Sequence, residues 1–282
     1  MNEDYLENPL VSVVMASFNE PPEIIGQAIE SILAQTYPYL EFIIVDDSTE
    51  KSTKEKIDSY IDSRITIIRL QGHSWLPEKL NVGMRKAKGK YIARMDADDV
   101  ALNERLALQV KYLEDHEDIY VLGGQINLIN AEGKVFSEKR YPLGGLKLYL
   151  HSTYKSPFNH PSVMFRRELI YKGFYYSEDL IKTSEDIDLW LRVIHEGYKI
   201  ANIPEKITNY RIRNNMANWR GSREEISYMA NVRKRTFSWK KPFHSVLSLL
   251  AGMIFFCLPQ KAVIKMYEKM YQKDMEYISD AK

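Results

Sequence analysis

Apolar and polar positions alternate in blocks over the first hundred residues of the chain. Short, mostly apolar runs predict buried strands, and they fall at 11–16, 40–45, 65–70 and 91–95. The first of them is rich in β-branched residues. The segments between them have the pattern of helices, at about 21–33, 51–61 and 76–88. Strands that alternate with helices predict a parallel sheet with right-handed crossovers, so the expected fold class is α/β.

The pattern changes after residue 100. Residues 102–116 have the spacing of an amphipathic helix, whereas 120–128 and 135–136 predict a strand and a hairpin. Residues 160–165 predict another strand, and 200–213 predict two extended segments broken at Pro204. A helix is expected from Ser184 through His195, with the Ser184 side chain as its N-cap.

Composition sets limits on the class of protein. The 282 residues are 45% hydrophobic and 27% charged, which is ordinary for a globular protein. The net charge is +1, but 217–282 carry twelve Lys or Arg against six Asp or Glu. A slightly acidic body with a basic tail is not typical of a nucleic-acid binder, so no nucleic-acid partner is expected.

Two further features favour a cytoplasmic location. Cys257 is the single cysteine, so no intrachain disulfide can form, which suits a reducing compartment. The acidic start of the chain lacks the pattern of a signal peptide.

An acidic cluster follows directly after the strand at 91–95. Asp96 and Asp98 are separated only by the small Ala97, so on extended backbone both point the same way, and Asp99 comes next. Carboxylates on one side repel each other unless a cation lies between them, and a hard divalent ion such as Mg²⁺ suits oxygen ligands. The alternative is an acidic turn in which Asp98 or Asp99 caps the following helix.

Polar residues stand at the ends of several predicted strands. The carboxyl ends of parallel strands form the ligand-binding edge of an open sheet, so these residues are expected to gather where a nucleotide would bind. Neither a Gly-x-Gly-x-x-Gly nor a P-loop pattern is present. The residues at this edge are Ser17, Asn19, Asp46, Asp47, Asp96 and Asp98.

At this point the chain resembles family 2 glycosyltransferases of the GT-A fold, many of which build bacterial surface polysaccharides. The matching segments occur in the family's order and cover about 9–215. They are VSVVMASFNE at 11–20, IIVDDST at 43–49, LNVG at 80–83, GKYIARMDADD at 89–99, HPSVMFR at 160–166 and SEDIDLW at 184–190.

The resemblance implies a fold and a division of the chain. The fold would be a Rossmann-like, mostly parallel central sheet flanked by helices, with a helical C-terminal extension. The catalytic domain would span 1–215, with a nucleotide-sugar half at 9–100 and an acceptor half at 101–215. The extension would span 216–282.

The resemblance also implies roles for individual residues. Residues on the nucleotide-sugar side would be Ser17, Asn19, Glu20, Asp46, Asp47, Asn81, Arg94, Asp96 and Arg213. A divalent metal, Mn²⁺ or Mg²⁺, would be held on the diphosphate by Asp98 and Asp96. Asp186, beside Glu185, would be the general base that activates an acceptor hydroxyl. His160 and Trp190 could touch the acceptor, although a turn residue and a core residue are the simpler interpretations.

The implied activity is metal-dependent transfer, with inversion, of a hexose or N-acetylhexosamine from a UDP-sugar. The acceptor would be a saccharide, lipid-linked, in the synthesis of O-antigen, capsule or exopolysaccharide. Relatives often carry a histidine where Arg213 stands, so that metal ligand is missing. The Gln-x-x-Arg-Trp pattern of polymerising relatives is also absent, which favours single addition.

Two alternatives remain open. A sugar nucleotidyltransferase would normally carry a Gly-rich loop after the first strand, where this chain has Ser17 to Glu20. A non-catalytic, nucleotide-binding membrane scaffold would not need Asp98 and Asp186.

The C-terminal tail combines basic and apolar residues at 220–258. The apolar run at 246–258 is too short, at ~1.5 Å per residue, to cross a hydrocarbon core of ~30 Å. It predicts an interfacial segment next to a stretch that attracts anionic lipid, at the inner face of the cell membrane. The alternative is a buried helix packed on the catalytic domain.

Overall fold

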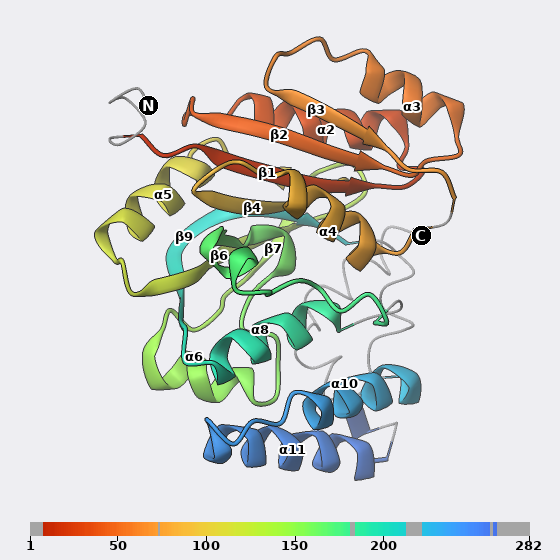
Figure 1. Ribbon diagram of the computed structural model, residues 1–282. Coiled ribbons are helices and arrows are strands. Elements are labelled where there is room, and N and C mark those ends of the chain that lie inside the picture. The colour runs from red at the N-terminus through yellow and green to blue at the C-terminus, as the bar shows by residue number, and fades with distance from the viewer. Residues whose placement is uncertain (1–7, 73, 181–183, 213–221, 260–261, 264–282) are drawn as a thin grey trace.

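The computed structural model describes residues 8–72, 74–180, 184–212, 222–259 and 262–263. One continuous sheet runs through the upper part of the molecule in Figure 1, with helices on both of its faces. A second helical layer lies below it, and two C-terminal helices form the lower edge.

The first four strands form the parallel part of the sheet. β1 (Val11–Ser17), β2 (Leu40–Asp46), β3 (Ile65–Arg69) and β4 (Tyr91–Asp96) lie in the order β3-β2-β1-β4, and every pair is parallel. They are joined by α2 (Pro22–Leu33), α3 (Lys51–Asp58) and α4 (Leu76–Lys86). The α/β fold class and these seven elements are confirmed, with ends that move by three residues at most.

Beyond β4 the sheet is mixed. β8 (Met164–Arg166) lies antiparallel to β4 and β6 (Ile119–Ile129), and β6 runs parallel to β9 (Lys199–Arg211). β5 (Val100–Ala101) closes this end against β9, while β7 (Val135–Lys139) forms the expected hairpin with β6.

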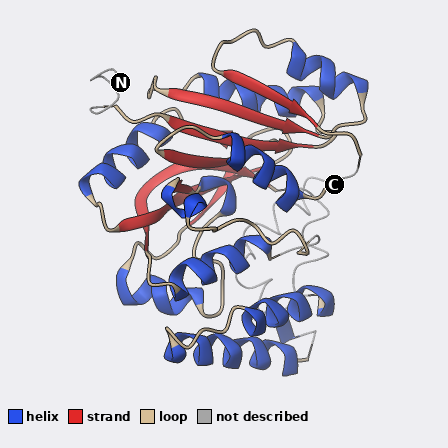
Figure 2. Cartoon of the chain, viewed as in Figure 1, coloured by secondary structure: helices blue, strands red, loops and turns tan. Residues whose placement is uncertain are grey.

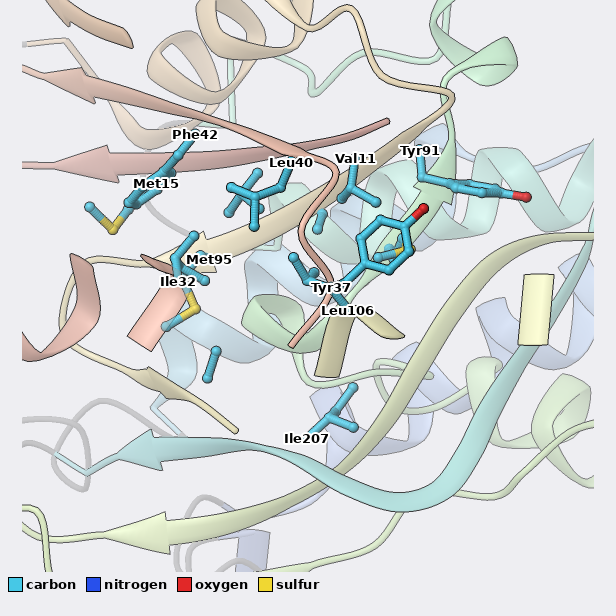
Figure 3. Packing of buried hydrophobic residues seen from close by; sticks show 14 of the residues in the cluster. Val11, Met15, Ile32, Tyr37, Leu40, Phe42, Tyr91, Met95, Leu106 and Ile207 are labelled. Carbon is cyan, nitrogen blue, oxygen red and sulfur yellow. The ribbon is translucent and has the colours of Figure 1, made fainter. Parts of the chain in front are cut away.

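Two hydrophobic clusters cover the two faces of the sheet. Alternate residues of β1 face opposite ways, so Val13 and Met15 pack under α2, whereas Val14 packs under α4. The first cluster joins α2 to α5 (Arg105–Asp115), and Figure 3 shows Met15, Ile32 and Met95 inside it. The second cluster joins α4 to α8 (Glu185–His195) and α7 (Glu168–Tyr171).

Three sequence-based expectations are wrong in detail. His160–Ser162 forms a 3-10 turn, because Pro161 cannot donate to a ladder, and the strand starts only at Met164. β9 is one strand, with Pro204 in a bulge where Gly123 and Gln125 pair with Asn202 and Lys206. The Ser184 side chain does not cap α8; its φ of +67° is left-handed, whereas a capping residue is extended.

Within its described residues the C-terminal extension is helical, as expected, and packs on the preceding part of the chain. α10 (Arg223–Arg235) contacts α8, and α11 (Pro242–Cys257) packs along α10. α6 (Gly145–Ser152), which the sequence pattern did not indicate, contacts β9, and its Ser152 lies 2.8 Å from His244 of α11. Figure 2 shows these helices below the sheet. Within the described part of the chain, no helix is long and apolar enough to cross a membrane.

Candidate active site

The carboxyl ends of three neighbouring strands lie at one level. Ser17 pairs with Asp46 in the register of β1 and β2, and Ala16 pairs with Asp96 in that of β1 and β4. The strand-end residues expected from sequence therefore meet at one edge of the sheet.

Three carboxylates form a cluster that can hold a cation. Asp96, Asp98 and Asp99 each offer an oxygen within 4.8 Å of the others. Asp99 is buried; its Oδ1 accepts the backbone N–H of Arg211 at 2.7 Å, and its Oδ2 has no partner. Burial, then the charges of Asp96 and Asp98, raise the pKa of Asp99 well above its usual range. An orphaned oxygen and like charges fit a hard divalent ion, so Asp99 joins Asp96 and Asp98 as a candidate ligand.

Arg94 places a buried positive charge at this edge. It lies on β4, is only 3% exposed, and pairs with Asp96. Its backbone N–H donates to the Val163 carbonyl at 2.9 Å, whereas its Nε and Nη1 are buried without a partner. Unused guanidinium donors suit phosphate or sugar oxygens, because arginine presents a planar fork to such anions.

The two aspartates that end β2 are already hydrogen-bonded. Asp46 pairs with Arg69 and accepts from Ser48 Oγ at 2.6 Å. Asp47 Oδ2 accepts the Ser74 N–H at 2.6 Å. The two carboxylates therefore tie the end of β2 to β3 and to the loop that follows β3.

The loop after β1 is tied to the loop after β2. Asn19 adopts a left-handed φ of 58°, and its Oδ1 accepts the N–H groups of Thr49 and Glu50 at 2.7 and 2.9 Å. Glu20 accepts from Ser17 Oγ at 3.2 Å and from the Phe18 N–H at 2.8 Å. Asn19 thus connects the two loops that the resemblance assigns to the nucleoside.

Lys79 is a charged residue of this edge that sequence reasoning missed. It is 6% exposed, and its Nζ donates to the Ser17 carbonyl at 3.2 Å. Burial lowers its pKa, while Glu20 and Asp47 act in the opposite direction. The available signal was a lysine on the apolar face of the helix at 76–88, directly before the LNVG segment.

Asn81, which the resemblance places on the nucleotide-sugar side, is bonded to a distant segment of the chain. It is 1% exposed, and its side chain bonds the backbone of Tyr176 and the carboxylate of Glu178. Asn81 therefore holds the segment that carries Tyr176.

Asp186, the predicted general base, and its neighbour Glu185 stand at the start of α8. Ser156 Oγ donates to Asp186 Oδ2 at 3.1 Å, and His160 Nδ1 lies 3.7 Å from Glu185 Oε1. Burial, then the neighbouring Asp186, raise the pKa of Glu185 to about 8. Burial also raises the pKa of Asp186, against the backbone N–H groups of the helix start and the Ser156 hydroxyl. The charge of Arg94 lowers the pKa of Glu185 and that of Asp96 raises it, so Glu185 lies within electrostatic range of the strand edge.

His160 and Tyr176 line the same region. His160 Nε2 lies 2.8 Å from the Tyr176 hydroxyl, and burial lowers the pKa of His160 well below its usual range, so its ring is neutral. Tyr176 was missed, since nothing in a Tyr-rich sequence distinguishes it. Trp190 is a core residue, 1% exposed and in edge contact with Phe158 and Phe165, so its ring is not an open platform for a sugar.

Arg213 lies outside the described residues. Two positions earlier, Arg211 is buried and is used by the protein itself. Its Nε donates to the Asp98 carbonyl at 2.8 Å, and its Nη1 donates to the carbonyls of Asn130 and Ala131. Arg211 therefore fixes the backbone of the acidic cluster.

The acidic cluster and the buried Arg94 at the edge of this mixed sheet, with Glu185 in electrostatic range, fit a glycosyltransferase of the GT-A fold. Residues 12–174 match the profile of the family described as Glycosyl transferase family 2. The chain belongs to this family.

Two relatives illustrate its range. The chain is 34% identical to the O-antigen biosynthesis glycosyltransferase WbnJ of Escherichia coli over 263 residues, 91% of this chain and 97% of that one. It is 26% identical to the E. coli UDP-Glc:alpha-D-GlcNAc-diphosphoundecaprenol beta-1,3-glucosyltransferase WfaP over 215 residues, 72% of this chain and 77% of that one.

Solved structures share the fold at low identity. S. aureus TarS 1–349 in complex with UDP-GlcNAc superposes with a TM-score of 0.68 at 18% identity, covering 87% of this chain and 72% of that chain. The mannosyltransferase PcManGT of Pyrobaculum calidifontis, in complex with GDP-Man and Mn²⁺, gives 0.63 at 17% identity, covering 94% and 81%. Both are GT-A glycosyltransferases, which confirms the expected fold.

Proposed function

We propose that the protein is an inverting, metal-dependent glycosyltransferase that moves a hexose or N-acetylhexosamine from a UDP-sugar to a saccharide acceptor. The observation that carries this proposal is the position of Asp186 and Glu185 within electrostatic range of Arg94 and Asp96. The product would belong to a surface polysaccharide such as O-antigen, capsule or exopolysaccharide, and WbnJ supports this context.

The donor would lie across the strand edge. Ser17, Asn19, Glu20, Asp46 and Asp47 would border the nucleoside. The free donors of Arg94 would bind the diphosphate or the sugar. A Mn²⁺ or Mg²⁺ ion held by Asp98, Asp96 and Asp99 would offset the charge that builds on the departing diphosphate. The UDP-GlcNAc bound to TarS and the Mn²⁺ of PcManGT support a donor of this class.

Asp186 would be the general base. Two adjacent buried carboxylates do not both ionise readily, because each charge opposes the other. Glu185, with its pKa near 8, is then mostly protonated at pH 7, and the ionised partner is Asp186, which Ser156 and the helix N–H groups stabilise. Asp186 would take the proton of the acceptor hydroxyl while that oxygen attacks the anomeric carbon. A single displacement inverts this carbon.

The acceptor would be a lipid-linked saccharide at the inner face of the cell membrane. The name of WfaP describes a sugar on a diphosphate-linked polyprenol as acceptor, which supports this class. His160 and Tyr176, beside Glu185, would border the acceptor.

A panel of UDP-sugars and GDP-mannose, each with Mn²⁺, Mg²⁺ or chelator, tests the proposal. The expected result is metal-dependent release of UDP that increases when a lipid-linked saccharide is added. Formation of pyrophosphate from a sugar phosphate and a nucleoside triphosphate would instead indicate a nucleotidyltransferase. Binding of every donor without turnover would indicate a scaffold.

A further inference from the structure

α11 has its polar residues inside and its apolar residues outside. The buried positions are His244, Ser245, Ser248 and Gly252. Large apolar side chains on the other side are 44–68% exposed, and their spacing of three and four residues places them in one line along the helix. This outer stripe consists of Phe243, Val246, Leu250, Met253 and Ile254.

Hydrogen bonds on the inner side fix this orientation. His195 Nδ1 lies 2.6 Å from the Thr236 carbonyl and must donate to it, so His195 Nε2 accepts from His244 Nδ1 at 2.9 Å. His244 Nε2 lies 2.8 Å from Ser152 Oγ and 3.1 Å from the Tyr149 carbonyl. Ser245 Oγ bonds both the N–H and the carbonyl of Ser238. Rotating α11 to bury its apolar side would break these hydrogen bonds, so they hold the outer stripe on the exposed side of the helix.

The outer stripe lies at the margin of the molecule. In Figure 1, α10 and α11 form the lower edge, on the opposite side from β3 and α3. A line of exposed Phe, Leu, Met and Ile side chains is unusual on a soluble surface and marks a contact site.

The chemistry next to the stripe indicates the partner. α11 contains no Asp, Glu, Lys or Arg, but Trp239, Lys240 and Lys241 stand directly before its first residue. Trp239 is 83% exposed, and Lys234 is exposed at the end of α10. Tryptophan and lysine next to an apolar helix face are complementary to the headgroup region of an anionic membrane.

We propose that the outer stripe lies in the surface of a membrane that contains anionic lipid, with the axis of α11 in the membrane plane. Sixteen residues span ~24 Å at the helical rise, short of a ~30 Å hydrocarbon core, so the helix lies along the membrane and does not cross it. The reason for such membrane binding rests on the proposed function, because the membrane surface would present a lipid-linked acceptor to Asp186. α8 connects the two, since it carries Asp186 at its start and His195 at its end.

The test is sedimentation of the full chain with vesicles of phosphatidylglycerol and phosphatidylcholine, compared with phosphatidylcholine alone. We expect binding that is stronger with phosphatidylglycerol and weaker in high salt. Ile254→Gln should lower partitioning by ~10-fold, because it removes an inserted apolar side chain. Ile61→Gln is the matched control, since Ile61 is fully exposed near α3, and it should bind as the unchanged protein does.

A second pair of variants tests the charge. Lys240→Gln should reduce binding to phosphatidylglycerol vesicles by ~5-fold, as expected for one lysine near an anionic surface. Lys240 is paired with Glu196, so the control is Lys51→Gln, another exposed lysine paired with a glutamate. This control should leave binding unchanged.

Several outcomes would overturn the proposal. One is that the full chain sediments with neither kind of vesicle. Another is that Ile254→Gln binds phosphatidylglycerol vesicles as well as Ile61→Gln does. A dimer that dissociates with Ile254→Gln would assign the stripe to a second copy of the chain. Vesicle binding only after removal of 264–282 would assign it to the chain's own C-terminus.

The membrane inference and the proposed function fail separately. UDP binding and transfer to a water-soluble acceptor do not require the outer stripe, so they should be equal in all four variants. Vesicle binding without transfer to any acceptor would refute the function alone. Transfer without vesicle binding would refute the membrane inference alone.

Discussion

Asn81 holds Tyr176 by both backbone groups, across 95 positions of the chain. Its Nδ2 donates to the Tyr176 carbonyl at 2.9 Å, and its Oδ1 accepts the Tyr176 N–H at 3.0 Å. The same Nδ2 also reaches Glu178 Oε1 at 2.9 Å. α4 is thereby fastened to the segment that places Tyr176 against His160.

We expect Asn81→Asp to destabilise the protein. An aspartate can still accept the Tyr176 N–H, but it leaves the Tyr176 carbonyl unpaired and sets a buried charge beside Glu178. The free energy of unfolding should fall by about 2–4 kcal/mol, as for a broken buried network. Urea denaturation measures it, with Asn231→Asp as the exposed control. Equal losses in both variants would deny Asn81 this role.

Asp98→Ala should abolish metal-dependent binding of UDP. The variant removes one of the three carboxylates of the candidate cation site, which leaves two carboxylate ligands for the ion. Calorimetry with UDP and Mn²⁺ measures the affinity, and Asp115→Ala, an exposed aspartate at the end of α5, is the control. Unchanged affinity in Asp98→Ala, with metal present, would remove Asp98 from the site.

Asp186→Asn should lower kcat by a factor on the order of 10² or more with little change in donor binding, because it keeps the shape but removes the base. In the unchanged protein kcat should fall as pH drops through the raised pKa of Asp186, and this fall should be absent from the variant. Glu185→Gln is the companion variant, and its loss should be smaller. If Glu185→Gln is the more damaging change, the base is Glu185.

The contact between His195 and His244 should make the protein acid-sensitive. Burial, then the neighbouring His195, lower the pKa of His244 to about 4 in the folded protein, against ~6.5 when it is unfolded. The unfolded chain therefore binds the proton more readily, and stability is lost as pH falls from about 6.5 through 4. Each unit of this shift corresponds to about 1.4 kcal/mol of unfolding free energy.

His244→Gln tests this linkage. Glutamine can still bond Ser152 but cannot be protonated, so Tm should depend less steeply on pH between 6.5 and 4 in the variant. The difference between the two slopes is the measured quantity, and it reports His244 together with His195, which contacts it. Identical slopes would show that His244 does not set the acid response.

The sequence by itself determined the parallel half of the sheet and the acidic cluster. Apolar runs encode β1, β2 and β4 locally, and the carboxylates of the cluster lie at the end of β4 or within three residues of it. The family resemblance added the start of α8, where Glu185 and Asp186 are also neighbours in sequence. Such features need only local spacing, which a sequence displays directly.

Only the tertiary structure decided which distant groups meet. Packing between separate elements brings Asn81 to Tyr176 and His160 to Glu185. It also buries Arg94 with two guanidinium nitrogens that have no hydrogen-bond partner. The direction of α11 is the sharpest case. An apolar run favours burial by composition alone, yet His244 and Ser245 face inward. Their polar groups find partners on α8 and the preceding turn, and the apolar side chains are left outside.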